Sequence, residues 1–187
     1  MNESHINECI NKAKIGIEKY TKIQKKFRST DVSSDIDFQT QFNHFYKIRQ
    51  KNKNWYLKYY RLMEDLKSKE SVDFSYIIKD IYGFSCCLEA SFSSKMLATL
   101  NANMPVWDRF VLDNLNIKPP PYKSKERMKL MIQAYEKICN WYNDNLQAEE
   151  GMMIISIFNK KISNANEFSD TKKIDFVLWQ SRSGIES

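Results

Sequence analysis

A lysine and an aspartate flank a short polar break near the middle of the chain. Lys95 lies in the segment Ser91–Leu100, and Asp108 follows the segment Pro105-Val-Trp107. The spacing predicts two short helices, with Asp108 at the start of the second. A carboxylate there could stabilise a cationic sugar or activate water, and a deprotonated lysine could attack a sugar carbon. The alternative is an ordinary capped helical corner, because aspartate is a common helix N-cap.

A second candidate surface is a basic segment, residues 47–61, that contains six cations, four aromatic side chains and no acid. The cations are Lys47, Arg49, Lys51, Lys53, Lys58 and Arg61, and the aromatic residues are Trp55, Tyr56, Tyr59 and Tyr60. Cations neutralise phosphates, and aromatic faces can stack on unpaired bases, so the segment predicts a nucleic-acid-binding face. The alternative is a solvated helix whose tyrosines pack inward.

The distribution of charge favours an anionic partner. The 187 residues have a formal net charge of +6. Residues 1–69 carry 15 Lys and Arg against 8 Asp and Glu, whereas residues 70–187 carry 14 against 15. Such asymmetry is typical of proteins that bind anions, with nucleic acid the first candidate.

Composition and periodicity predict an all-α fold. Four glycines and four prolines are few for this length, which favours long helices over a many-stranded sheet. Apolar side chains recur every three or four residues, which predicts eight to ten helices in a single compact domain, 1–187. Residues 1–69 are expected to form its basic helical part, and residues 70–187 the part with the helical hairpin and the C-terminal helices. Two lobes around a cleft are the alternative arrangement.

Capping residues predict where several helices begin and end. Helices are expected to begin at Glu3, at Ser34 or Asp35, at Ser71–Asp73, at Ser124 and at Asp170 or Thr171. A break is expected in the second of these near residues 52–54, and Gly83 is expected to end the third. The apolar run 151–158 is expected to be a buried helix, with a strand as the alternative.

Cysteine, histidine and hydropathy patterns bound the class of protein. The adjacent pair Cys86 and Cys87 fits neither a CxxC redox motif nor a zinc knuckle, so all four cysteines are expected to be reduced and mostly buried. Two histidines are too few for a metal-site signature, and no metal, nucleotide or flavin cofactor is expected. The sequence contains no run of eighteen apolar residues, so no membrane span is expected. The start of the chain lacks a signal-peptide pattern, and a cytoplasmic location is therefore expected.

The stretch Ser91–Val111 resembles the helix-hairpin-helix DNA glycosylases, in particular their eight-oxoguanine glycosylase-like branch. In that family a hairpin is followed by a Pro-Val-Asp segment whose aspartate opens the next helix, with an apolar residue three positions on. The matching residues are Pro105, Val106, Asp108 and Val111, with Trp107 inserted before the aspartate. Lys95 falls near the place where lyase-type members carry their nucleophilic lysine.

The resemblance implies a DNA glycosylase that flips a damaged or modified base out of the stack and cleaves its N-glycosidic bond. Asp108 would be the charge-stabilising carboxylate, and Lys95 a nucleophile that adds lyase activity. Trp107 and Phe92 would stack on the base or fill the gap it leaves. The partner would be DNA, either single-stranded or a duplex carrying a lesion.

Phosphate contacts of the hairpin are expected from Ser93 and Ser94, because residues 90–94 lack the glycines of the family hairpin. Two other functions stay open. One is a catalytically silent module that holds DNA or RNA through residues 47–61. The other is a protein-interaction component of a bacterial or phage defence system, which predicts an exposed apolar patch instead.

Overall fold

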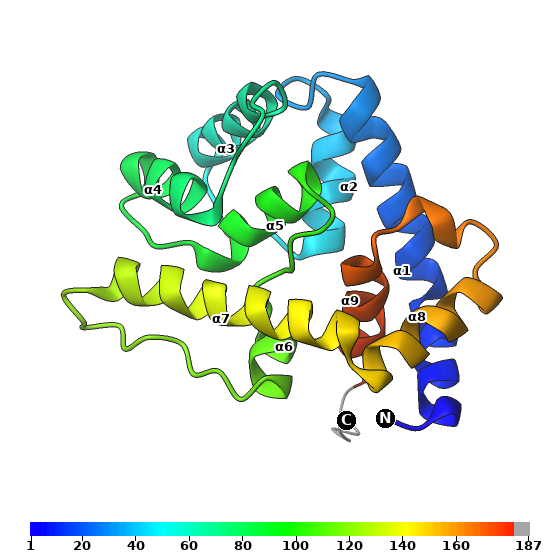
Figure 1. Ribbon diagram of the computed structural model, residues 1–187. Helices are drawn as coiled ribbons and strands as arrows, with labels where there is room; N and C mark the ends of the chain where they lie inside the picture. The colour runs from blue at the N-terminus through cyan, green and yellow to red at the C-terminus, as the bar shows by residue number, and fades with distance from the viewer. Residues whose placement is uncertain (182–187) are drawn as a thin grey trace. The chain divides into compact units, whose positions relative to one another are not determined.

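The structure is a computed structural model that describes residues 1–181. All regular secondary structure in this range is helical, which confirms the all-α prediction (Figure 1). The helices are α1 (Glu3–Ser29), α2 (Ile36–Tyr46), α3 (Lys53–Leu66), α4 (Phe74–Ser85), α5 (Ala90–Leu100), α6 (Arg109–Asn114), α7 (Arg127–Gln147), α8 (Glu149–Lys161), a short 3-10 helix η1 (Ala165–Glu167) and α9 (Asp170–Gln180). Each of these helices is too short or too polar to cross a lipid bilayer.

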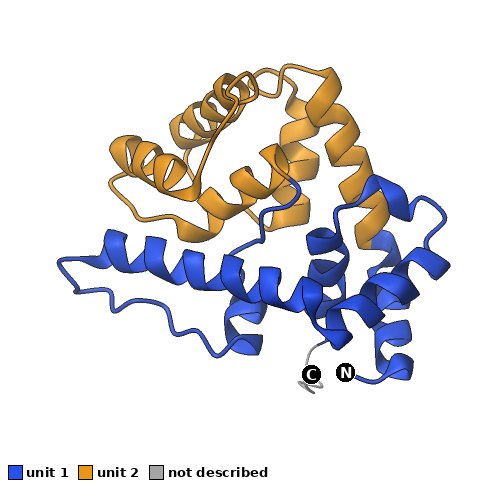
Figure 2. Ribbon diagram, in the orientation of Figure 1, with its two compact units in different colours: residues 1–15, 102–187 blue, residues 16–101 orange. Residues whose placement is uncertain are grey.

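The helices group into two compact units (Figure 2). The middle unit is residues 16–101, which include the second half of α1 and helices α2 to α5. The terminal unit is residues 1–15 together with the chain from residue 102 onward. The middle unit carries 15 Lys and Arg against 10 Asp and Glu, and the described part of the terminal unit carries 13 against 12. The positive charge therefore belongs mainly to the middle unit.

The core of the middle unit is a cluster of aromatic rings from α2 and α3. Phe42 is fully buried, and its ring centroid lies 5.5 Å from that of Phe38 and 5.9 Å from that of Tyr60. Tyr59 is also fully buried and donates its hydroxyl proton to the Phe92 carbonyl of α5 at 2.9 Å. Burial raises the pKa of Tyr59 and Tyr60 well above the ordinary tyrosine value. The aromatic residues of α3 are thus structural residues that hold α2 and α5 in place.

Several helices begin where their capping residues predict. Four N-cap side chains accept a hydrogen bond from a backbone N–H three residues on: Asp35, Asn52, Asp73 and Ser169. The expected break within the second helical run is the loop between Tyr46 and Lys53, slightly earlier than predicted. Residues 151–158 lie within α8, so the helical reading of this apolar run is confirmed and the strand alternative is wrong.

Two predicted helix limits were wrong. Gly83 lies inside α4, and Cys86 ends the helix instead, in the left-handed conformation with φ 53°. A glycine in a helix interior costs only about 1 kcal/mol, and the buried side chains of Ile77, Ile78 and Ile81 outweigh that cost. Ser124 does not cap α7, because its hydroxyl accepts from the N–H of Glu126 within a turn and the helix begins at Arg127.

The prediction that the cysteines are mostly buried was also wrong. Cys9 is buried and Cys139 is partly buried, but Cys86 and Cys87 are exposed. All four are free thiols, as expected. The adjacent pair lies at the end of α4, beyond the last buried side chain of that helix, Ile81. The apolar character of cysteine was therefore not enough to predict that Cys86 and Cys87 are buried.

Helix α9 is the centre of the terminal unit. Every residue from Thr171 to Leu178 is buried, and α6, α7 and α8 all pack against this helix. The Phe176 ring stacks on that of Phe158 at a centroid distance of 6.2 Å. Trp179 is partly exposed, and its ring contacts Phe110 of α6 edge-on at 6.5 Å. A helix buried on all sides ordinarily has only apolar side chains, so the charged residues of α9 need partners.

Candidate functional site

Residues 47–61 comprise Lys47, which is the C-cap of α2, a short loop and the first part of α3. Lys47 and Gln50 both have left-handed backbones, with φ 53° and 62°. The side chain of Asn52 then accepts a hydrogen bond from the N–H of Trp55 at 2.9 Å and starts α3. The loop is therefore a tight connection between α2 and α3.

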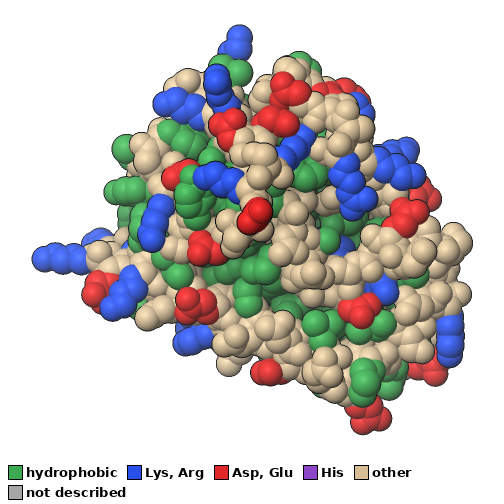
Figure 3. Space-filling view, turned by 45° about the horizontal axis from the view of Figure 1, so that its top comes forward, with side chains coloured by type: hydrophobic (Ala, Val, Ile, Leu, Met, Phe, Trp, Pro, Cys, Tyr) green, Lys and Arg blue, Asp and Glu red, His purple; other side chains and the backbone are tan. Residues whose placement is uncertain are grey.

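Five of the six cations in this segment are exposed to solvent: Lys47, Arg49, Lys53, Lys58 and Arg61. We call these five residues the basic face. Lys51 differs, because it is ion-paired with Glu89 and its Nζ lies 5.4 Å from the ring centroid of Trp55. The fold thus supplies an acid that the sequence of the segment lacks. In the view of Figure 3, Lys and Arg side chains stand out from the surface with Asp and Glu side chains between them.

The aromatic residues of the segment mainly face the core. Trp55, Tyr59 and Tyr60 are buried, and the rings of Trp55 and Tyr59 stack at 4.8 Å. Tyr56 is partly buried and donates its hydroxyl proton to the Ile48 carbonyl at 3.3 Å. The inward-packed arrangement, which was the alternative reading of this segment, is the observed one. The groups available to a nucleic acid are therefore the cations rather than the rings.

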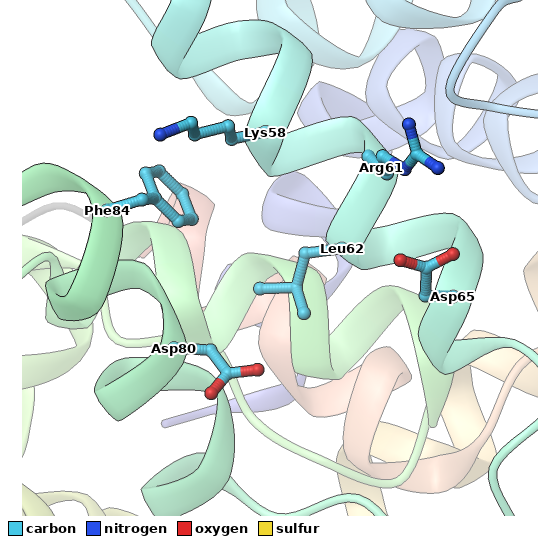
Figure 4. A pocket seen from close by; sticks show the side chains of 6 residues that line it. All are labelled: Lys58, Arg61, Leu62, Asp65, Asp80 and Phe84. Atoms are coloured by element: carbon cyan, nitrogen blue, oxygen red, sulfur yellow. The ribbon is translucent and has the colours of Figure 1, made fainter.

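An open pocket of about 210 Å³ lies between α3 and α4 beside the basic face. Its lining residues are Lys58, Arg61, Leu62, Asp65, Asp80 and Phe84 (Figure 4). Lys58 extends over the ring of Phe84, with its Nζ 5.9 Å from the centroid, and Arg61 extends in the opposite direction. Two carboxylates balance the two cations here. The pocket itself therefore offers no net positive charge to a phosphate, whereas Arg49 and Lys53 lie outside it.

Lys95 is buried within the middle unit. Its side chain is on α5, and its Nζ donates a hydrogen bond to the carbonyl of Tyr46 at 2.9 Å. The same Nζ lies 5.4 Å from the ring centroid of Phe92. These contacts tie α5 to the end of α2. A nucleophilic role for Lys95 would require it to leave this carbonyl.

The other residues expected near the hairpin are also packed into α5. Ser93 and Ser94 are fully buried, and their hydroxyls donate to the carbonyls of Glu89 and Ser91, both at 2.9 Å. Phe92 is partly exposed, and its ring lies edge-on to Trp55 at 5.5 Å. In this conformation a phosphate in solvent reaches neither serine hydroxyl. Phosphate contact by these serines stays a prediction that would need α5 to open.

Asp108 belongs to the terminal unit and caps α6. Its Oδ1 accepts a hydrogen bond from the N–H of Phe110 at 3.0 Å, and its side chain is partly exposed. Trp107 next to it is buried, which matches a core role. Lys95 and Asp108 thus lie in different compact units, each held by contacts of its own unit. The predicted helix, break and second helix are all observed, as α5, the link 101–108 and α6.

A buried polar cluster in the terminal unit was missed by sequence reasoning. Lys172 and Asp175 form an ion pair of 2.5 Å inside α9, and Asp175 also accepts a hydrogen bond from the Tyr142 hydroxyl at 3.2 Å. Burial, followed by the negative charge and the hydrogen bond of Asp175, raises the pKa of Tyr142 well above its ordinary value. The available signal was the Lys-to-Asp spacing of three, which is also common on exposed helices.

Comparisons of the chain with known protein families, with curated proteins and with solved structures found no match.

Proposed function

We propose that this protein binds nucleic acid through the basic face of its middle unit, without requiring catalysis. The observation that supports the proposal is the exposure of Lys47, Arg49, Lys53, Lys58 and Arg61 within one tight helix–loop–helix segment. Exposed cations neutralise phosphates and release counterions, which makes affinity strongly dependent on salt. The surplus of five positive charges in the middle unit also attracts a negatively charged nucleic acid, and it acts over a longer range.

The predicted mode of binding is contact with the phosphate backbone rather than readout of bases. The aromatic rings of the segment are used in the core, so few remain for stacking on unpaired bases. Phosphate contacts position a nucleic acid but carry no sequence information. We therefore expect little sequence preference, and similar affinity for oligonucleotides of the same length and different sequence.

Removal of the basic face is the direct test of this function. Replacing Arg49, Lys53, Lys58 and Arg61 together by Ala is expected to weaken binding to a single-stranded oligonucleotide by about 100-fold at low salt. The slope of log affinity against log salt should fall by about 3, since each lost phosphate contact on a single strand contributes about 0.7. Fluorescence anisotropy over a salt series measures both quantities.

A matched variant separates local contact from net charge. Lys118, Lys123, Lys125 and Lys160 are exposed cations of the terminal unit, and replacing all four by Ala removes the same total charge. This variant should retain most of the affinity and the salt slope. Equal losses in the two variants would contradict a specific basic face, and absence of binding by the unmodified chain would favour the protein-interaction function.

A second candidate function is base excision, and Asp108 is the observation that favours it. Its carboxylate is partly exposed at the start of α6. A carboxylate within reach of solvent suits cleavage of a glycosidic bond, in which it stabilises positive charge or activates water. This function further requires a flipped base to reach Asp108, and Lys95 to be available if strand cleavage accompanies excision.

Excision assays test this second function separately from binding. Asp108→Asn is expected to lower excision from a panel of lesion-containing duplexes by about 100-fold or more, because a neutral amide cannot stabilise the sugar cation. Asp113→Asn is the matched control, since Asp113 is an exposed carboxylate on the same helix, paired with Arg109 at 3.6 Å. A borohydride-trapped adduct that is lost in Lys95→Ala would assign the nucleophile. Absence of excision from every duplex would rule out this second function for the lesions tested.

A further inference from the structure

The exposed cysteine pair Cys86–Cys87 is a chemical feature that nucleic-acid binding does not use. Cys86 ends α4 in the left-handed conformation, and its N–H donates to the Tyr82 carbonyl at 2.8 Å. The hydroxyl of Ser85 accepts from the N–H of Cys87 and donates to its carbonyl, both at 3.1 Å. These bonds hold the backbone of the turn and leave both thiols exposed at the surface. Free cysteine is among the most buried residue types, so two adjacent exposed thiols are unusual.

The other two cysteines provide an internal contrast. Burial raises the pKa of the Cys9 thiol, and raises that of Cys139 to about 11. A thiol reacts through its thiolate, so Cys139 has very little reactive form near neutral pH. Cys9 is in addition closed off from solvent. Reaction of the folded chain with a water-soluble reagent should therefore concentrate on Cys86 and Cys87.

Adjacency decides what such a reaction would produce. Consecutive Cα atoms are about 3.8 Å apart across a trans peptide, and the described backbone contains no cis peptide bond. Disulfides usually join Cα atoms about 4.4–6.8 Å apart, so a bond between Cys86 and Cys87 would be strained. A strained, exposed disulfide is readily reduced again. Oxidants in solution can therefore reach the two cysteines, and a disulfide between them can be reduced again.

We propose that Cys86–Cys87 is a reversible modification site that reacts with low-molecular-weight disulfides such as glutathione disulfide. The thiolate of one cysteine attacks the reagent, forms a mixed disulfide and releases one thiol, which takes up the proton. The thiolate of the neighbouring cysteine then attacks the protein sulfur of the mixed disulfide, closes the Cys86–Cys87 bond and releases the second thiol. In total the two cysteines lose two electrons and two protons, and one glutathione disulfide is reduced to two glutathione molecules. The cysteine pair does not include any residue of the basic face. A negative result for this modification site would therefore leave the proposed nucleic-acid binding untested, and the reverse also holds.

The test uses the full chain, fully reduced, and glutathione disulfide as the probe. Intact mass, peptide mapping and released thiol are followed with time. Before Cys139 reacts, the unmodified chain is expected to become two hydrogens lighter, with no adduct on Cys86 or Cys87, two glutathione molecules released and a bond mapped to Cys86 and Cys87. Cys86→Ser and Cys87→Ser should each stop at one stable glutathione adduct, because the resolving thiol is missing. Addition of dithiothreitol should restore the starting mass in all three.

The rates give a second criterion. Cys86 and Cys87 are expected to react at least about tenfold faster than Cys139, because the Cys139 thiolate is scarce. Cys139→Ser should leave the products and their rates unchanged. Three results would each overturn the proposal: no faster reaction at the pair than at Cys139, two separate glutathione adducts on the pair without ring closure, or the same closed product in a chain that lacks Cys86.

Discussion

Replacing Asp175 by Ala is expected to lower the free energy of unfolding by about 3–5 kcal/mol. The side chains of Lys172 and Asp175 are exposed by only 6% and 11%, and they form an ion pair of 2.5 Å within α9. Removal of the carboxylate leaves the Lys172 ammonium buried without its ion-pair partner, and the Tyr142 hydroxyl loses its acceptor. Urea unfolding followed by far-UV circular dichroism measures the change.

The same helix offers a matched control for this prediction. Lys173 and Asp170 also form an ion pair with a spacing of three residues, at 2.8 Å, but the Asp170 side chain is 52% exposed. The Lys173 side chain is 7% exposed and so is about as buried as that of Lys172, and only the carboxylates differ in burial. Because Asp170 is partly solvated and water can reach the Lys173 ammonium once it is removed, its replacement by Ala should cost about 1–2 kcal/mol, less than that of Asp175. The difference between the two variants therefore reports mainly the burial of the carboxylate, because the two ammonium groups are similarly buried. Equal effects in Asp170→Ala and Asp175→Ala would contradict the prediction.

A double variant separates the penalty of an unpaired charge from the value of the pair itself. Replacing Lys172 by Met and Asp175 by Leu removes both charges while keeping similar volume, and such exchanges are often close to neutral. We expect the double variant to be more stable than Asp175→Ala by about 2 kcal/mol or more. A double variant as unstable as the single one would instead show that the hydrogen bond to Tyr142 carries the effect.

The buried ionic groups bear on function as well as on stability. Lys95 in the middle unit and Lys172 in the terminal unit are both buried, and each has a named acceptor. Such a lysine is a structural residue as long as its acceptor stays in place. The cations of the basic face differ in that solvent reaches their side chains. This contrast is why we place the proposed function on the basic face and base excision second.

The helices could be predicted from the sequence because their signals are local. Amphipathic spacing identified α1, and single side chains such as Asp35 and Asp73 marked helix starts that the structure confirms. Gly83 misled the prediction because its preference is weak compared with the burial of neighbouring isoleucines. Local patterns thus succeed wherever the competing tertiary energy is small.

The surroundings of the candidate site could not be predicted because they depend on residues distant in sequence. Glu89 pairs with Lys51, and the Tyr46 carbonyl accepts from Lys95. Neither contact has a signal in the segment 47–61, where only the absence of acids is visible. The exposure of Cys86 likewise depends on where the buried face of α4 ends. The residue types in the sequence predicted which side chains could bind or react. Packing between distant parts of the chain decides which of these side chains solvent can reach.

The largest steric effect of a single methyl group is expected at Gly151. A Cβ atom placed there would lie 1.8 Å from the carbonyl oxygen and 2.7 Å from the carbonyl carbon of Asn145. Both are backbone atoms at the end of α7, so no side-chain rotation can relieve the overlap, and the α7–α8 corner must shift. Overpacking of this kind costs about 1–3 kcal/mol and sometimes more, so we expect Gly151→Ala to lower the free energy of unfolding by about 3 kcal/mol.

Gly83→Ala is the matched control, because the same methyl group there meets no atom within 4 Å. Gly83 lies in the interior of α4 with an ordinary helical backbone, so alanine should stabilise the chain by about 0.5–1 kcal/mol through lower unfolded-state entropy. The two variants thus make the same chemical change with opposite expected signs, and urea unfolding measures both. Destabilisation by Gly83→Ala would contradict its assignment to the interior of α4. A neutral Gly151→Ala would contradict the close approach of the α7 and α8 backbones, on which the α7–α8–α9 packing of the terminal unit depends.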